Sequence, residues 1–312
     1  MKRILGIDFS GASDAGRKIW IAEAQHDPAA YDAPLVIDRC FPATELPNSG
    51  VAPQLALPAL ARHIAAMPQT VAGCDFPFSL PAELVDAARW TDFITGFPAR
   101  FPDHDAYRLL NRTRTNLIEI KRQTDRLAGT PFNSYNLRLY RQAWWGMAHL
   151  LHPLIVSKKA IVIPQMTSRR GIPTIMEVCA ACSLKHLDCY PSYKGRTALH
   201  RRSRQRILDC LIELNLLAAP KRALRQQLLD NIGGDALDAV IGAVATTRAD
   251  FRRKADRFER LEGRVFFELR RDCDRPEQAI GKAAPPAFRM HKPCDARPHE
   301  IGRRSASARR PS

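Results

Sequence analysis

The N-terminal segment KRILGIDFSGA places a single charge, Asp8, inside an apolar run typical of a β-strand. A carboxylate in such a strand loses its hydration on folding, which costs several kcal/mol unless a metal ion or another partner compensates it. The fold must therefore bring a compensating group to Asp8. We expect partners near the other end of the chain, where GGDALDAVIGAVATTRA opens a helix with Asp235 and Asp238.

Length and composition indicate an ordinary globular protein. The 312 residues are 45% hydrophobic, enough for one large domain with a sizeable core. There is no apolar run of about 18 residues and no signal-peptide pattern at the N-terminus, so we expect a cytoplasmic protein with no membrane partner. Eight cysteines over this length are too dilute for a disulfide framework and predict mostly buried thiols.

The charge balance favours a polyanionic partner such as nucleic acid. Lys and Arg number 48 against 32 Asp and Glu, which gives a net charge of +16 and a pI near 9.9. Residues 281–312 carry eight basic and two acidic residues among Pro and Ser, and they predict a basic, disordered tail after a domain of residues 1–280. The other basic stretches are either a solvated Arg-rich surface or an anion-binding surface.

The order of apolar patterns predicts a mixed α/β fold. Strands are expected, the first two as an antiparallel hairpin, at 2–10, 16–25, 34–41, 70–80, 173–182 and within 261–272. Helices are expected at 52–67, 194–217 and 235–248, with a loop at 221–234. The segment from about 82 to 163 is helical throughout and predicts an inserted helical subdomain.

The acidic residues of this pattern suggest a metal site. Asp235 and Asp238 share one helix face because they are three residues apart. If Asp8 and Asp75, the carboxylate of strand 70–80, face the same side, the cluster repels itself unless cations are bound. Carboxylate oxygens suit Mg²⁺ or Mn²⁺, and two such ions about 4 Å apart would clamp a phosphodiester undergoing hydrolysis. Local alternatives remain: Asp235 as a helix cap, and Asp8 and Asp75 as turn residues.

Several motifs, in this order, resemble those of domain-of-unknown-function family 429 (DUF429), a family of predicted RNase H-like nucleases. They are GIDFSGA, GCDFPFSLP, RQTDR at 122–126, MEVCAAC and DALDAVIGAVAT, and the resemblance covers about residues 4 to 270. It implies a five-stranded mixed sheet flanked by helices. Asp8 would lie on the first strand, Asp75 at the end of the fourth, and Asp235 and Asp238 on the last helix.

The resemblance also makes Arg122, Asp125 and Glu177 candidate substrate contacts. The structural alternatives are an internal ion pair between Arg122 and Asp125 and an arginine partner for Glu177. Family members often have Glu-Val-Tyr-Pro where this chain has Cys179 and Ala180 after Glu177 and Val178, which weakens the case for Glu177. The closing D-x-x-D helix is similar to that of Holliday-junction resolvases, whose acidic residues hold metal.

The sequence therefore predicts a divalent-metal-dependent nuclease acting on DNA or RNA, with phosphate contacts from arginines within 108–126 or 196–206. One alternative is a non-catalytic nucleic-acid-binding module. Another is an ATPase of the actin-like or sugar-kinase class, because G-I-D-F-S-G also resembles a phosphate-binding loop, although a second loop of the D-x-G-T type is absent. The cluster Cys179, Cys182, His186 and Cys189 has zinc-ligand residue types, but buried thiols explain it more simply and zinc is not expected.

Overall fold

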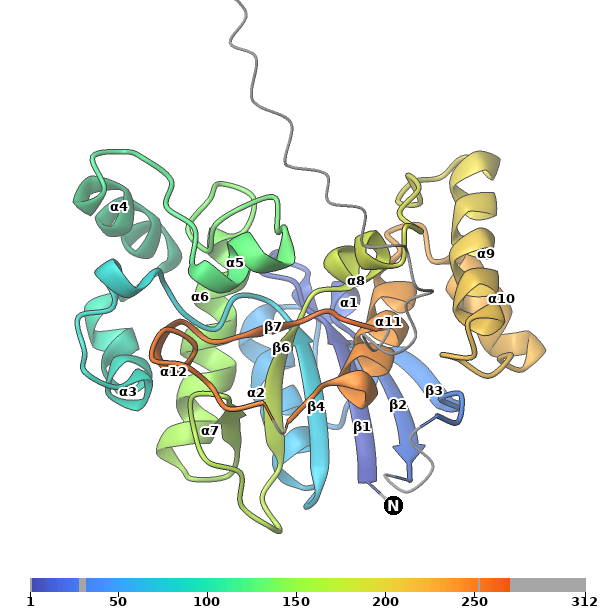
Figure 1. Cartoon of the computed structure of the whole chain (residues 1–312), viewed down its shortest axis with the longest axis horizontal. Helices are drawn as coiled ribbons and strands as arrows, with labels where there is room; N and C mark the ends of the chain where they lie inside the picture. Colours follow the sequence, from blue (N-terminus) through green and yellow to red (C-terminus); the bar gives the residue numbers. More distant parts are fainter. Residues whose placement is uncertain (1, 28–31, 252, 270–312) are drawn as a thin grey trace, which may run out of the picture. The chain divides into compact units, whose positions relative to one another are not determined.

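A mixed β-sheet forms the centre of the computed structural model, which describes residues 2–27, 32–251 and 253–269 (Figure 1). The predicted tail at 281–312 lies outside the described residues. The strands are β1 (Lys2–Asp8), β2 (Trp20–His26), β3 (Ile37–Pro42), β4 (Thr70–Asp75), β5 (Ile161–Ile163), β6 (Thr174–Val178) and β7 (Val265–Phe266).

The sheet has seven strands in the order β3-β2-β1-β4-β6-β5, and β7 pairs with β6. The pairs β1–β2 and β2–β3 are antiparallel, whereas β4, β5, β6 and β7 add in parallel. The resemblance implied five strands, and that number was wrong. β5 was not expected because its three residues are too short for a periodic pattern, whereas β7 lies within the strand expected at 261–272. Both pair with β6, β5 along residues 174–176 and β7 along 177–178.

Helices cover both faces of the sheet. They are α1 (Ala15–Lys18), α2 (Pro53–Ala65), α3 (Trp90–Arg100), α4 (His104–Arg114), α5 (Gln123–Ala128), α6 (Tyr140–Gly146), α7 (His152–Val156), α8 (Ala180–His186), α9 (Ala198–Glu213), α10 (Arg222–Asp230), α11 (Asp235–Arg248) and α12 (Glu259–Glu262). Short helical turns lie at Ala43–Glu45, Ala82–Leu84 and Met147–Leu151.

The alternation of side chains along β1 divides the core into two. Leu5 and Ile7 pack in the core that α2 and the helices between β4 and β5 cover. Ile4 packs in the second core, which α8, α9, α10 and α11 cover. Figure 1 shows α11 across the front of β1 and β2, with α2 behind the sheet. Trp90 and Phe97 of the predicted helical insertion belong to the first core, so the insertion shares its core with the sheet.

Three predicted elements differ from the structure. The expected loop at 221–234 contains α10, because Leu224 and Leu228 are spaced by four residues and pack on the second core. The expected strand 173–182 ends at Val178, and α8 begins at Ala180. The strand expected to reach residue 80 ends at Asp75, where the Phe76 backbone N–H turns back to the Cys74 carbonyl.

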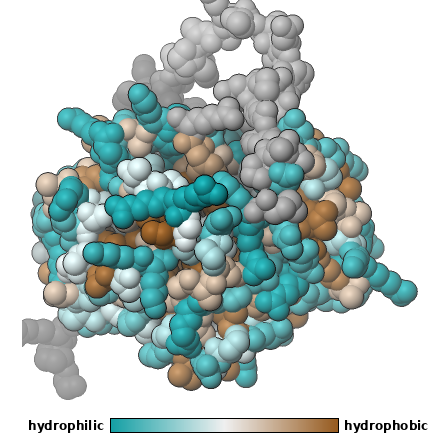
Figure 2. Space-filling model, turned by 90° about the horizontal axis from the view of Figure 1, so that it is seen from below, coloured by the Kyte–Doolittle hydropathy of each residue, from teal (hydrophilic) through white to brown (hydrophobic). Residues whose placement is uncertain are grey.

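None of the described helices combines the length and the apolar character needed to cross a membrane. On the face shown in Figure 2, hydrophilic residues predominate and apolar residues form small, scattered patches.

Candidate metal centre

Two carboxylates of the predicted site end adjacent parallel strands. Asp8 is the last residue of β1 and Asp75 the last of β4, and the two are direct partners in the register. Residues paired in this way point to the same face of a sheet. Gly6 and Gly73, two residues earlier on each strand, face α11, so Asp8 and Asp75 point to the α11 face as well.

The two glycines also explain how α11 reaches the carboxylates. A Cβ on Gly6 would lie 2.0 Å from the Ala239 carbonyl oxygen, and one on Gly73 would lie 2.1 Å from Thr246 Oγ1. No larger residue fits, so helix and sheet make a backbone-to-backbone approach here. The first turn of α11 therefore carries Asp235 and Asp238 to the ends of β1 and β4, as their spacing predicted.

Asp238 is the most buried of the four carboxylates, at 3% exposure. The Tyr193 hydroxyl donates to its Oδ1 at 2.6 Å, and the Lys194 ammonium lies 2.6 Å from its Oδ2. Both oxygens are therefore occupied by donors from the loop between α8 and α9. The N-cap position of α11 is Gly234, with no side-chain cap hydrogen bond, so Asp235 is the first helical residue and not the cap that the sequence left open.

Asp75 is held from a different side. Its Oδ2 accepts a hydrogen bond from the backbone N–H of Ala180, the first residue of α8, at 3.1 Å. Its carbonyl oxygen accepts one from the Gln142 side chain, at 2.5 Å. The strand end and the carboxylate are thus fixed by α6 and α8, while the second carboxylate oxygen has no described hydrogen-bond donor.

The four carboxylates are close enough to perturb one another. Burial raises the pKa of Asp8 well above its ordinary value, and the charges of Asp238, Asp235 and Asp75 raise it further. Burial and Asp238 raise the pKa of Asp75 to about 7. Burial also raises the pKa of Asp235, against the opposing effect of Lys194. Such mutual destabilisation of charge is typical of functional sites rather than of structural ion pairs.

The three other candidate residues form a separate cluster. The guanidinium of Arg122, at 0% exposure, donates to both oxygens of Asp125 and both oxygens of Glu177. Glu177 also accepts from the Phe78 backbone N–H at 3.0 Å, and Arg122 donates to the Glu262 carbonyl at 3.1 Å. These side chains are buried against one another, which does not support the prediction that they contact substrate.

Electrostatics agree with a structural role for this second cluster. Burial raises the pKa of Glu177, although Arg122 opposes that shift. Burial also works against the charge of Arg122, but Asp125 and Glu177 hold its pKa well above the ordinary value. The arginine thus stays charged and compensates two buried carboxylates at once.

The cysteine cluster contains a disulfide bond. Cys179 and Cys182 are joined as a disulfide at the start of α8, which corrects the expectation of free thiols at these positions. Cys40, Cys74 and Cys189 are buried free thiols, as expected. The C-x-x-C spacing spans one helical turn, which brings the two sulfur atoms together.

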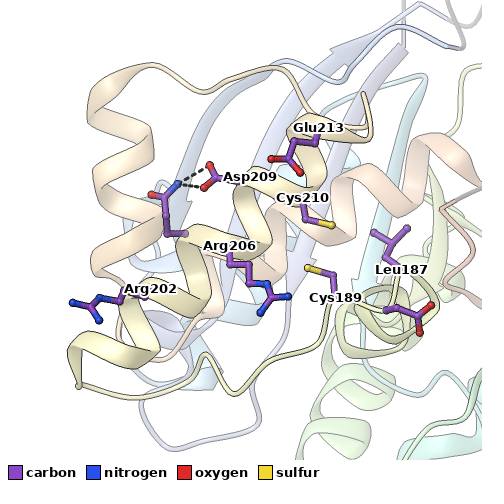
Figure 3. Close-up of a pocket in the computed structure, with 9 residues that line it drawn as sticks. Leu187, Cys189, Arg202, Arg206, Asp209, Cys210 and Glu213 are labelled. Carbon is purple, nitrogen blue, oxygen red and sulfur yellow. Dashed lines mark hydrogen bonds between the residues drawn. The ribbon is translucent and has the colours of Figure 1, made fainter.

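A cavity of about 500 Å³ lies beside α9 (Figure 3) and contains none of the predicted site residues. Figure 3 shows the sulfur atoms of Cys189 and Cys210 directed toward the same space. The cavity is lined by both acidic and basic side chains: Asp188, Asp209 and Glu213 with Arg202 and Arg206. This mixture of charges selects no class of ligand.

Two arginines in each of the stretches expected to bind phosphate are engaged within the protein. In the first, Arg114 pairs with Asp86 and Arg122 is buried. In the second, Arg201 pairs with Asp230, and the buried Arg204 bonds to backbone carbonyls. Specific phosphate contacts by these residues are not supported.

The donor chemistry fits a hard divalent cation, but the cluster is not assembled as a finished cage. Within residues 2–27, 32–251 and 253–269, no three Asp, Glu, His or Cys side chains are arranged to hold a metal ion. The Lys194 ammonium stands at the Asp238 oxygen that a cation would use. Metal binding by Asp8, Asp75, Asp235 and Asp238 therefore requires Lys194 to move.

Comparison with protein-family models, curated proteins and solved structures found no match. The resemblance to family 429 therefore rests on the order of its motifs.

Sequence reasoning missed Lys194 and Tyr193. Both lie in a basic stretch, YKGRTALHRRSRQR, whose lysine and arginines look interchangeable in sequence. Gly195, with φ +147, directly follows Lys194 and is the one local sign that this loop has a fixed shape.

Proposed function

We propose that this protein is a divalent-metal-dependent nuclease that hydrolyses phosphodiester bonds in DNA or RNA. The observation that carries the proposal is the group of four carboxylates at the ends of β1 and β4 and the start of α11, in which burial and Asp238 raise the pKa of Asp8, Asp75 and Asp235. Buried carboxylates that raise one another's pKa serve no stabilising purpose without a cation.

The sheet supports an RNase H-like interpretation of the fold. Three antiparallel strands come first and parallel strands follow, in the arrangement that the resemblance implies. Asp8 ends the first strand, Asp75 ends the fourth, and Asp235 and Asp238 open the long last helix. These are the positions that the motifs assign to the acidic site.

Asp8, Asp75, Asp235 and Asp238 would hold Mg²⁺ or Mn²⁺. When bound, such an ion supplies positive charge to the phosphodiester as negative charge develops in the transition state. Asp235 is less buried than Asp238 and has a raised pKa, so it is the carboxylate best suited to orient or deprotonate an attacking water. Asp75, fixed by the α8 backbone, keeps one oxygen available at the site.

One observation favours a second candidate, a non-catalytic nucleic-acid-binding module. The Lys194–Asp238 ion pair neutralises part of the cluster without any metal. In a binding module this pair would be permanent, and the net positive charge of the chain would attract nucleic acid without cleavage.

The test is a panel of labelled substrates: single-stranded DNA, duplex DNA, four-way junctions, single-stranded RNA and RNA–DNA hybrids. Each is incubated with Mg²⁺, Mn²⁺ or EDTA and the wild-type protein or Asp8→Asn. Asp92→Asn, which removes an exposed carboxylate from α3, is the matched control.

We expect at least one substrate to be cleaved with Mg²⁺ or Mn²⁺ by wild type and Asp92→Asn, and none by Asp8→Asn. Nucleic-acid binding without cleavage under every condition would instead select the binding module. Cleavage in EDTA, or undiminished cleavage by Asp8→Asn, would contradict the site assignment.

A further inference from the structure

The ion pair between Lys194 and Asp238 joins a half-exposed group to a buried one. The side chain of Lys194 is 54% exposed, whereas that of Asp238 is 4% exposed, although the charged atoms lie 2.6 Å apart. A lysine side chain is flexible and its ammonium is a point charge without directional demands. The ammonium can therefore leave Asp238 for another anion while the carboxylate stays in place.

The backbone on both sides of Lys194 is anchored. The buried guanidinium of Arg204 donates to the Tyr193 carbonyl at 2.5 Å and to the Gly195 carbonyl at 3.2 Å. The Gly195 backbone N–H donates to the Ile232 carbonyl at 2.9 Å, which ties the loop to the segment that leads into α11. Movement at Lys194 is thus confined to its side chain, and its range stays centred on the acidic cluster.

Lys194 also acts on the rest of the cluster. Its charge lowers the pKa of Asp8, Asp75 and Asp235, opposing the effects of burial and repulsion. A divalent ion placed among these carboxylates would do the same, and it would repel the ammonium. The lysine and the ion therefore compete for one position.

We propose that Lys194 couples metal loading to substrate binding. Without substrate, its ammonium occupies Asp238 in place of a divalent ion. When a nucleic-acid strand enters, a backbone phosphate oxygen accepts the ammonium, and Asp238 is released to bind the cation. Lys194 is then a positioning residue that makes the site bind its metal tightly only when a phosphodiester is present. This inference rests on the proposed nuclease function.

The test measures Mn²⁺ affinity by isothermal titration calorimetry at fixed pH, without relying on activity. The proteins are the wild type, Lys194→Met, and Lys159→Met, which removes an exposed lysine just before β5, at the opposite end of the parallel strands. Each is titrated alone and with a short single-stranded DNA carrying phosphorothioate linkages. The same DNA with an uncharged methylphosphonate backbone is the probe control.

Wild type and Lys159→Met should bind Mn²⁺ about 10-fold more tightly with the phosphorothioate DNA than alone, and the methylphosphonate DNA should give no gain. Lys194→Met should bind Mn²⁺ about 10-fold more tightly than wild type without DNA, and DNA should add little further affinity. Lys194→Gln, titrated beside it with thermal unfolding as a fold check, should reproduce this behaviour.

Equal Mn²⁺ affinity of wild type and Lys194→Met, with binding lost in Asp8→Asn, would overturn the coupling and leave the nuclease proposal intact. Absence of Asp8-dependent Mn²⁺ binding from every protein, with and without DNA, would overturn both.

Discussion

Two groups of buried carboxylates lie near the same end of the sheet, and they are compensated in different ways. Glu177 pairs in register with Cys74, and residues paired in this way point to the same face of the sheet. The Cys74 side chain packs in the first core, on the face opposite α11, so Glu177 also points away from α11. Asp75, the next residue along β4, faces α11. On one face a buried arginine neutralises two acids through four hydrogen bonds. On the other, four acids face one half-exposed lysine.

The difference teaches how to separate structural from functional acids. Fixed, buried partners such as Arg122 satisfy the charge permanently and leave no oxygen for a ligand. A flexible partner such as Lys194 compensates the charge only in part, so burial and the repulsion by Asp238 still raise the pKa of Asp8 and Asp75. We therefore propose that the α11 face carries the chemistry and that the Arg122 cluster stabilises the fold.

The largest expected effect on stability is that of Arg122→Met. This change leaves Asp125 and Glu177 buried without a cation, and removing one partner of a buried ion pair costs about 4 kcal/mol. Lys194→Met should destabilise the protein much less, because solvent reaches that side chain. Urea unfolding monitored by circular dichroism measures both. Similar losses of unfolding free energy in the two variants would contradict the distinction between the two clusters.

A matched pair of amide substitutions should change stability in opposite directions. Glu177→Gln weakens the ion pairs of Arg122 and should destabilise the protein by about 2 kcal/mol. Asp75→Asn removes repulsion and should stabilise the metal-free protein at pH 8 by about 2 kcal/mol. Urea unfolding in the presence of EDTA measures the change in the free energy of unfolding for both variants. If Asp75→Asn instead lowered the free energy of unfolding, the charge of Asp75 would be compensated within the folded protein, which would contradict this prediction.

The gain from Asp75→Asn should depend on pH. The pKa of Asp75 in the folded protein, about 7, is above its ordinary value of 3.8. Well below pH 3.8 the carboxyl is protonated in both the folded and the unfolded chain and contributes no difference in stability. As pH rises from about 4 to 7, the unfolded chain ionises first, and the wild type loses stability relative to Asp75→Asn. A gain that is constant from pH 4 to pH 8 would contradict this origin.

A smaller effect is expected from metal itself. Mn²⁺ at ten times its dissociation constant should stabilise the wild type by about 1.4 kcal/mol, which is about 2–4 °C in melting temperature. Asp8→Asn should show no shift, Glu177→Gln should keep it, and EDTA should reverse it. Differential scanning fluorimetry measures all four cases. If Glu177→Gln lost the increase in melting temperature, the metal would bind on the Arg122 side of the sheet, which would contradict the assignment to the α11 side.

Local patterns identified the four carboxylates that the structure brings together. Asp8 and Asp75 stand out as charges in apolar strands, and Asp235 and Asp238 share a helix face by spacing alone. Their convergence needed one more fact, the close approach of α11 to β1 at Gly6, which the small residues of the helix indicated. The antiparallel start of the sheet followed from the same segments.

Features that depend on distant residues could not be predicted. An arginine partner for Glu177 was an open alternative, but the partner, Arg122, lies 55 positions earlier, and nothing local identifies it. Lys194 resembles its basic neighbours until the structure places it on Asp238. β5 is three residues long and is recognised only by its pairing with β6. A single sequence shows which residues are near one another along the chain, whereas these contacts join residues that are near one another only in the folded structure.

The most direct test of the α11 face as the catalytic site is the initial rate of phosphodiester cleavage in Mn²⁺ by Asp238→Asn. The control is Asp230→Asn, which removes an exposed carboxylate that pairs with Arg201 near the end of α10. The account predicts a loss of about 10³-fold or more in Asp238→Asn, with unchanged folding and nucleic-acid binding, and wild-type rates in Asp230→Asn. Wild-type cleavage by Asp238→Asn would contradict it.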